Sequence, residues 1–289
     1  MIGIQMSQSS RIRVLFVAQG LRPTGPGRHL VKLLVYRNPA QVDVELFTFD
    51  RNDPEMLKMV TEEYGIKVTE VGVYFAHPMA YIRGIPMLLR RIREYQPHII
   101  QTHHSPIVDW AARLVTKWSR VPVNISRAVV MPKVYQTSRR KNIKGKLGWW
   151  FSRLGDWLTS FWVDYYLPNS MIVSQYLQEE EKIPSSKIIL IHNGVDTDFF
   201  APGETIQEQG RRLLGLTGEE RVISSVGLIK AAKGQFELAR AAVNLMHEFP
   251  EMKVVFVGKP QSQEDAIYMQ AIQRYIEDQQ LSHQFLFTG

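Results

Sequence analysis

The sequence predicts an α/β protein of two doubly wound, Rossmann-like domains, the second of them incomplete. Short apolar runs rich in Val, Ile and Phe alternate with helical stretches of about ten to fifteen residues, which is typical of βαβ units and parallel sheets. This pattern stops in a polar stretch and then restarts, and only three strands follow the restart. The length of 289 residues also corresponds to about two domains.

The first domain is expected to alternate strands with helices along most of its length. Its strands are expected at 11–19, 42–50, 66–73, 97–104, 121–126, 164–170 and 187–193. Its helices are expected from Arg28 onward and over 53–65, 78–96, 109–120 and 173–182. Because proline lacks a backbone donor, the helix over 78–96 is expected to be interrupted near Pro86.

The second domain repeats the pattern over a shorter stretch. Strands are expected at 221–227, 253–259 and 283–289, and helices at 233–247 and 264–280. A doubly wound nucleotide domain has about five or six strands, so three leave this one incomplete. The predicted organisation is a flexible N-terminus at 1–10, a first domain at 11–200, a linker at 201–220 and a partial second domain at 221–289.

The composition narrows the class of protein. The chain has no cysteine, which excludes disulfide and thiolate chemistry and fits a reducing compartment. The first ten residues are too polar for a secretory signal, and no run approaches the ~18 apolar residues of a membrane span. We therefore expect a cytoplasmic protein. The net charge of +7 favours an anionic partner, but no recognisable motif indicates nucleic acid.

An acidic D-x-D sequence, Asp196-Thr197-Asp198, stands at the end of the first domain. Two such carboxylates could help to hold a divalent cation. They could equally accept hydrogen bonds from local backbone amides and shape a turn, and the turn dipeptide Asn193-Gly194 precedes them. No further oxygen ligands are visible nearby in the sequence. We therefore favour the turn and expect no bound metal.

Several motifs in a fixed order resemble those of the family-4 glycosyltransferases of GT-B architecture. The family pattern is an N-G-V-D turn followed by V-G-R-L and K-G, and here "IHNGVDTDFFAP" precedes "VGLIKAAKG". The pieces "TGPGRHL", "PHIIQTHH", "YYLPNSMIVSQYL" and "VVFVGK" agree with the family in order and spacing. The resemblance spans residues 11–289.

The resemblance implies a hexosyl-type glycosyltransferase that moves a sugar from a nucleotide-sugar to an acceptor with retention of configuration, in polysaccharide or glycolipid synthesis. It implies no metal or other cofactor. The family's E-x7-E segment, which holds the donor sugar, is absent. We therefore expect a chain truncated within the second domain and inactive at this length. The alternative is a degenerate relative that acts as a binding protein.

Candidate donor-binding residues lie in two glycine-containing loops. Gly25 precedes the first helix, where a bare backbone and free amides could meet an anion, although a tight turn explains it equally well. The resemblance implies that Gly227, the backbone of Leu228 and Lys233 line the donor diphosphate. Leu228 replaces the family's usual arginine, and Lys230 is an open candidate to substitute for it.

Candidate acceptor-side residues follow two neighbouring strands. His103 and His104 end the strand over 97–104, and an imidazole can act as a general base near neutral pH. The resemblance aligns His103 with the family's cleft-side histidine, which makes it the catalytic candidate; a structural histidine is the alternative. Arg127, after the next strand, could bind a phosphate or an anionic acceptor through two hydrogen bonds.

A basic segment is followed by aromatic residues at helical spacing. Seven basic residues and no acid lie between Lys133 and Arg153, and an aromatic stripe continues to Trp162. Such a combination is typical of a surface that rests on anionic lipid, which would fit a lipid-linked acceptor and peripheral association with the inner face of the membrane. We favour the alternative, in which the stripe covers the sheet. The membrane-facing candidates are Arg139, Arg140, Lys141, Trp149 and Trp150.

Overall fold

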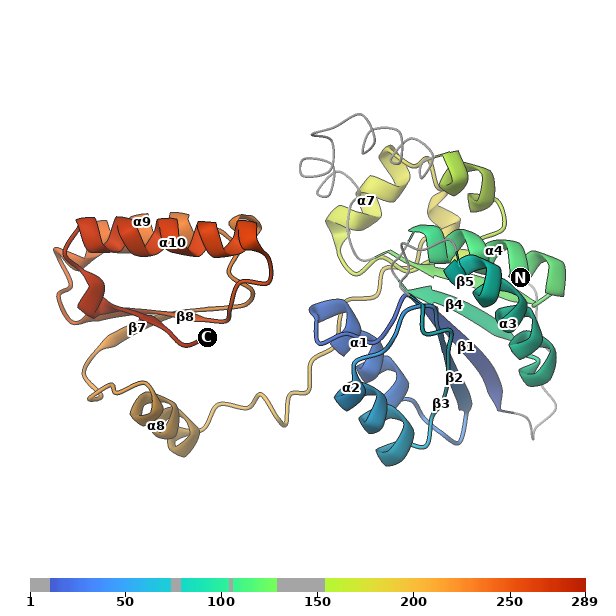
Figure 1. Cartoon of the computed structure of the whole chain (residues 1–289), viewed down its shortest axis with the longest axis horizontal. Helices are drawn as coiled ribbons and strands as arrows, with labels where there is room; N and C mark the ends of the chain where they lie inside the picture. Colours follow the sequence, from blue (N-terminus) through green and yellow to red (C-terminus); the bar gives the residue numbers. More distant parts are fainter. Residues whose placement is uncertain (1–10, 74–78, 104–105, 129–153) are drawn as a thin grey trace. The chain divides into compact units, whose positions relative to one another are not determined.

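The computed structural model describes residues 11–73, 79–103, 106–128 and 154–289, which form two compact units (Figure 1). The first unit is Met1–Gly194 and the second is Val195–Gly289. The boundary therefore falls at Gly194, whereas the sequence prediction ended the first domain at residue 200.

The first unit is built on a six-stranded parallel sheet in the order β3-β2-β1-β4-β5-β6. The order reverses between β1 and β4, as in doubly wound folds, where ligands bind at this switch point. The predicted fold class is confirmed for this unit. The strands are β1 (Ile12–Ala18), β2 (Val42–Thr48), β3 (Lys67–Glu70), β4 (Ile99–His103), β5 (Val123–Arg127) and β6 (Tyr165–Tyr166).

Helices cover both faces of this sheet. Along β1, Val14 and Phe16 pack with α1 on one face, while Leu15 and Val17 pack with α3 and α4 on the other. This is why β1 is a continuous apolar run from Val14 to Ala18. The elements are α1 (Gly25–Val35), α2 (Pro54–Lys58), the π-helix η1 (Met59–Glu63), α3 (Met79–Tyr95), α4 (Pro106–Ser119), a helix at 154–160, α7 (Met171–Glu179) and the 3-10 helix η2 (Ser185–Lys187).

Several predicted elements of the first unit differ from the structure. Helix α3 runs unbroken through Pro86, because this proline is exposed and the carbonyl that it leaves unbonded can be hydrated. Helix α1 begins at Gly25 and not at Arg28, with Pro26 fixing the backbone of its first turn. The strand expected at 187–193 is reduced to a single bridge between Ile188 and Tyr166. Its neighbour β6 is only two residues long, since Pro168 offers no amide to extend the ladder.

The second unit has a three-stranded parallel sheet in the order β7-β8-β9, which agrees with the three predicted strands. Helices α9 and α10 lie on the same face of this sheet (Figure 1), and Val254, Phe256 and Phe285 pack against them. The elements are α8 (Glu204–Leu213), β7 (Arg221–Val226), the 3-10 helix η3 (Ala231–Lys233), α9 (Gln235–Met246), β8 (Met252–Val257), α10 (Gln263–Asp278), the 3-10 helix η4 (Ser282–Gln284) and β9 (Phe285–Phe287).

The segment expected to be a linker, 201–220, contains helix α8. Glu204 stands in its first turn and Arg211 and Arg212 in its last, which suits the helix dipole. None of its residues is buried, and Ile206 and Leu213 are its only large apolar residues, so the sequence offers little apolar surface from which to predict a packed helix here. No helix in the described parts of the chain combines the length and the apolar character that crossing a membrane requires.

Candidate functional site

The carboxyl ends of β1, β4 and β5 bring the first group of candidate residues together. The sheet register places His103 beside Ala18 on one side and beside Arg127 on the other. A cavity of about 140 Å³ opens at this edge, lined in part by Gln19, Arg22 and His103. The register therefore places His103 and Arg127 side by side. His104 lies outside the described residues.

The loop before α1 contains two glycines with different surroundings. A side chain on Gly27 would collide with the carbonyl oxygen of Arg22, so packing alone requires glycine there. A side chain on Gly25 would meet no atom within 4 Å. Thr24, the N-cap residue of α1, makes no side-chain capping bond. The first turn of α1 therefore leaves open space beside Gly25, where an anion could approach the backbone.

His103 is held by the same loop. Its Nε2 atom lies 3.2 Å from the carbonyl oxygen of Pro26. A carbonyl oxygen only accepts, so Nε2 carries a proton in this contact and Nδ1 is the basic nitrogen of the neutral ring. The side chain is only 5% exposed, yet it lines the cavity. His103 thus orients the start of α1 and presents its ring to the cavity.

His29, on the first turns of α1, completes the cluster. Its ring stacks on His103 with centroids 6.0 Å apart, and its Nε2 atom lies 3.1 Å from Nη2 of Arg127. Burial, then the positive charges of Arg127 and Lys32, lower the pKa of His29 to about 4. At neutral pH the ring is uncharged and accepts a hydrogen bond from Arg127. His29 belongs to the "TGPGRHL" motif and could have been predicted from it, but His29 was not among the predicted site residues.

Arg127 is buried with neutral hydrogen-bond partners. It is 3% exposed, and its Nη2 atom also donates to Oδ1 of Asn193 over 2.8 Å. Burial lowers the pKa of Arg127, but a guanidinium stays charged at neutral pH. No carboxylate of the described residues forms an ion pair with it. The arrangement therefore offers a buried positive charge to an anionic group.

The candidate donor-binding residues of the second unit follow the ends of β7 and β8. Gly227 follows β7 with φ +153, and Gly258 follows β8 with φ +139. A side chain on Gly258 would collide with the carbonyl oxygen of Gly227. The two loops therefore touch backbone to backbone, and the amide of Ile229 donates to the carbonyl of Lys259 over 3.3 Å. The carbonyl of Leu228 accepts from Nε2 of the buried Gln235 over 3.0 Å.

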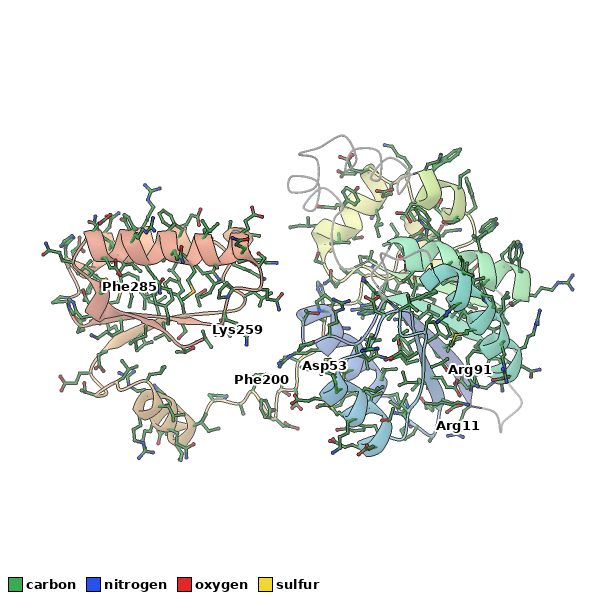
Figure 2. The ribbon with its side chains drawn as sticks, viewed as in Figure 1. Arg11, Asp53, Arg91, Phe200, Lys259 and Phe285 are labelled. Atoms are coloured by element: carbon green, nitrogen blue, oxygen red, sulfur yellow. The ribbon has the colours of Figure 1, made fainter. Side chains whose placement is uncertain are left out.

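Three lysines surround these loops. Lys233 is exposed and precedes Gly234, whose left-handed backbone (φ 70) begins α9. Helix α9 therefore begins at Gln235, whereas the prediction began it at residue 233. Lys230 is half-buried, and Lys259 is exposed at the end of β8 (Figure 2). No carboxylate in the described ranges pairs with these lysines. Lys259 was not among the predicted site residues, although its position directly after the strand-end glycine, Gly258, could have indicated it.

The D-x-D sequence forms the predicted turn. Oδ1 of Asp196 accepts from the amide of Asp198 over 3.1 Å and from the amide of Phe199 over 2.9 Å. The carbonyl of Asp196 accepts from the amide of Phe200. Asp196 therefore caps a turn, as expected.

The aromatic stripe differs from the interpretation that was favoured. Arg139, Arg140, Lys141, Trp149 and Trp150 lie outside the described residues. The helix at 154–160 turns small and polar residues inward: Gly155 meets the ring of Trp110, and Asp156 and Thr159 accept from the buried Arg113 over 2.9 and 3.1 Å. The inward face is thus already filled. The exposed side chains are Trp157 (63%), Leu158 (50%) and Phe161 (65%), so for these three the prediction of burial against the sheet is wrong.

Comparison with known proteins identifies related sequences. The model of "Glycosyltransferase Family 4" matches residues 23–199. A D-inositol 3-phosphate glycosyltransferase of Mycobacterium sp. (strain JLS) is 34% identical over 97 residues, which are 34% of this chain and 21% of that protein. Its counterpart in Corynebacterium aurimucosum is 31% identical over 98 residues, 33% and 23% of the two chains. The aligned stretch thus spans about a fifth of each curated relative.

Solved structures share the fold at low sequence identity. A glycosyltransferase from Rickettsia africae matches with a TM-score of 0.71 and 16% identity, covering 96% of this chain and 68% of that one. HepE from Anabaena, in complex with UDP-glucose, matches with a TM-score of 0.71, 16% identity and coverages of 96% and 69%. A UDP-GlcNAc 2-epimerase from Neisseria meningitidis matches with a TM-score of 0.59, 17% identity and coverages of 96% and 72%. The similarity to these structures establishes the fold.

Proposed function

Because the chain belongs to glycosyltransferase family 4, we propose that it transfers a hexosyl group from a nucleotide-sugar to an acceptor with retention of configuration. The match of the family model over residues 23–199 carries this proposal. The curated relatives named above are glycosyltransferases, and a structure of the same fold holds UDP-glucose. The activity would belong to the synthesis of polysaccharides or glycolipids.

The donor diphosphate is assigned to the loops of the second unit. Lys230, Lys233 and Lys259 place positive charge around the backbone of Gly227 and Leu228, next to the first turn of α9. Strand ends and helix starts of this kind bind phosphates in doubly wound folds. These lysines would stabilise the charge that develops on the leaving diphosphate, which is the task of a metal in other enzymes. We therefore propose transfer without a bound metal.

The acceptor is assigned to the first unit. Arg127 is a buried cation with neutral partners, which suits an acceptor that carries a phosphate. The curated relatives are named for D-inositol 3-phosphate, a phosphorylated polyol. His103 lines the neighbouring cavity and remains the catalytic candidate, since its ring could bind a reacting hydroxyl there. Gly25 would let a ligand approach the start of α1.

A membrane-bound acceptor is a further part of the proposal. Trp157, Leu158 and Phe161 form an exposed apolar face, and the basic run from Lys133 to Arg153 precedes it in sequence. Aromatic side chains and basic charge together favour the surface of an anionic membrane. We propose that this region of the first unit rests on lipid at the cytoplasmic face.

Two measurements test the proposal. Titration calorimetry with UDP should show binding to the second unit, and a transfer assay with UDP-glucose and D-inositol 3-phosphate should be followed by mass spectrometry and NMR. Any product that forms should be a hexosylated acceptor with the anomeric configuration of the donor. Absence of UDP binding would contradict the donor assignment, and an inverted product would contradict retention.

A further inference from the structure

The guanidinium of Arg127 has a buried nitrogen, Nε, without a hydrogen-bond partner in the described parts of the chain. Nη2 donates to Nε2 of His29 and to Oδ1 of Asn193, whereas Nε is buried and has no hydrogen-bond partner among the described residues. Nε and Nη2 form one edge of the guanidinium, and such an edge binds the two oxygens of a carboxylate or phosphate in bidentate pairs. Leaving a charged group buried without a counter-charge is costly, so this edge is suited to an oxyanion.

One of the two partners of Arg127, His29, is held in place by the fold. His29 lies on α1, one side of its ring stacks on His103, and burial keeps its pKa near 4. At neutral pH it can only act as an uncharged acceptor toward Arg127. Because α1 packs on the core through Leu30 and Leu34, His29 cannot withdraw without disturbing the sheet.

The other partner is a side chain that can leave. Asn193 is exposed, and the residue after it, Gly194, has open space where a side chain would lie. The amide oxygen of asparagine carries no formal charge, so it binds a guanidinium less strongly than a carboxylate or phosphate oxygen would. An anionic oxygen therefore replaces the Asn193 carboxamide at a net gain.

We propose that Arg127 forms an oxyanion site that the Asn193 carboxamide occupies until a phosphate group of the ligand displaces it. The departing Asn193 is next to Gly194, the last residue of the first unit. Ligand binding at Arg127 thus releases the chain segment that connects the two units. The proposal deepens the acceptor assignment made above, but oxyanion binding is measured without sugar transfer, so the two can fail separately.

The test uses inorganic phosphate as the probe and the whole chain labelled with 15N-arginine. The Nε–H signal of Arg127 is identified as the one that Arg127→Lys removes. Phosphate should shift this signal in the wild-type chain. A signal that phosphate leaves unchanged in both the wild type and Asn193→Ala would overturn the proposal. The signal also distinguishes this site from the lysines of the second unit, which could bind phosphate independently.

Two substitutions of Asn193 should differ in their effect on phosphate binding. Asn193→Asp supplies the missing negative charge from within the chain and should weaken phosphate binding at Arg127 by about tenfold or more, as expected for loss of a charge-assisted pair. Asn193→Ala removes the competing amide and should leave binding equal or tighter. Asn244→Asp adds the same charge at an exposed position of α9 and serves as the control. Equal phosphate affinity in Asn193→Asp and Asn193→Ala would refute displacement.

Release of the connecting segment has its own readout. Phosphate should speed proteolytic cleavage within residues 194–203 of the wild-type chain, and Asn193→Ala should show the faster cleavage without phosphate. Asn193→Asp should be protected in both conditions, because its carboxylate holds the segment to Arg127. Phosphate binding at Arg127 with unchanged cleavage of this segment in all three chains would disprove the release.

Discussion

At the scale of single residues, the chain around the start of α1 contains one glycine that packing requires, Gly27, and one that packing does not require, Gly25. Gly27→Ala should lower the free energy of unfolding of the first unit by about 1–3 kcal/mol, because its new methyl group collides with the Arg22 carbonyl. Gly25→Ala should leave stability close to wild type, since the space beside it is open. Urea unfolding measures both. Substantial destabilisation by Gly25→Ala would show that this glycine serves the turn and not a ligand.

The titration of His29 should make the first unit sensitive to acid. Its pKa is lowered from 6.5 to about 4, so between these values the unfolded chain binds a proton that the folded chain does not. The free energy of unfolding should therefore fall as pH drops from 6.5 toward 4. After allowance for solvent screening, the loss is on the order of 1 kcal/mol. His29→Gln keeps an acceptor for Arg127 and should flatten this part of the pH profile; an unchanged slope would contradict the assignment.

The lysines of the second unit should act on ligand binding and not on folding. Lys233→Ala should weaken UDP binding by about 1.5–3 kcal/mol, the range of a charge-assisted bond. Lys259→Ala should also weaken it, since the loops after β7 and β8 share a backbone hydrogen bond. Arg274→Ala, which removes an exposed charge from α10, is the control. Equal affinities in all three variants would remove these lysines from the site.

At the scale of elements, the helix at 154–160 depends on one buried arginine. Arg113 reaches from α4 to Asp156 and Thr159, and its side chain is 4% exposed. Burial raises the pKa of the nearby Asp109 to about 7, against the opposing effect of Arg113. The helix is thus docked by polar contacts whose charges are compensated inside the first unit.

Removal of Arg113 should therefore be far more costly than removal of a surface arginine. Arg113→Ala should lower the free energy of unfolding by about 3 kcal/mol, because it removes the positive charge that faces the buried Asp109 and the half-buried Asp156. Arg90→Ala breaks an exposed pair with Glu94 on α3 and should cost about 0.5 kcal/mol or less. Urea unfolding of both variants makes the comparison, and similar losses would show that the Arg113 cluster does not dock the helix.

The elements that the sequence predicts well are those whose pattern comes from burial on both faces. Strand β1 is a continuous apolar run from Val14 to Ala18 because helices cover the sheet on each side. Predictions from local sequence were wrong where exposure to solvent, or the contacts made by the opposite face of a helix, decided the structure. Pro86 is tolerated because it faces water, and the helix at 154–160 turns its aromatic residues outward because Arg113 needs its polar face.

The candidate site was predicted only in part, for a related reason. The register of adjacent strands made His103 and Arg127 predictable as neighbours. The partners of Arg127 are not local: His29 is separated from it by 98 residues and Asn193 by 66. No periodicity in one sequence encodes such contacts. His29 and Asn193 were both inside motifs that the resemblance had brought out, but their hydrogen bonds required the fold.

At the scale of the whole molecule, charge and exposed aromatic residues should act together. The chain carries a net charge of +7, and Trp157, Leu158 and Phe161 are exposed on the first unit. Long-range attraction to anionic lipid weakens as salt shortens the screening length to about 10 Å at 0.1 M. Apolar contact does not depend on salt in this way. Lipid binding should therefore contain a salt-sensitive part and a part that requires the aromatic face.

Co-sedimentation with phosphatidylserine vesicles separates these two parts. The wild-type chain should bind at low salt and be released at high salt, and Arg139→Ser with Arg140→Ser and Lys141→Ser should weaken the salt-sensitive part. Phe161→Ser should weaken binding at every salt concentration, since it removes apolar area from the contact. Tyr36→Ser is the control, because Tyr36 is similarly exposed (67%) but ends α1, which covers the opposite face of the sheet from α4 and its bound helix. If Tyr36→Ser and Phe161→Ser reduce binding equally, the aromatic face has no special role and attraction to lipid is a property of the net charge alone.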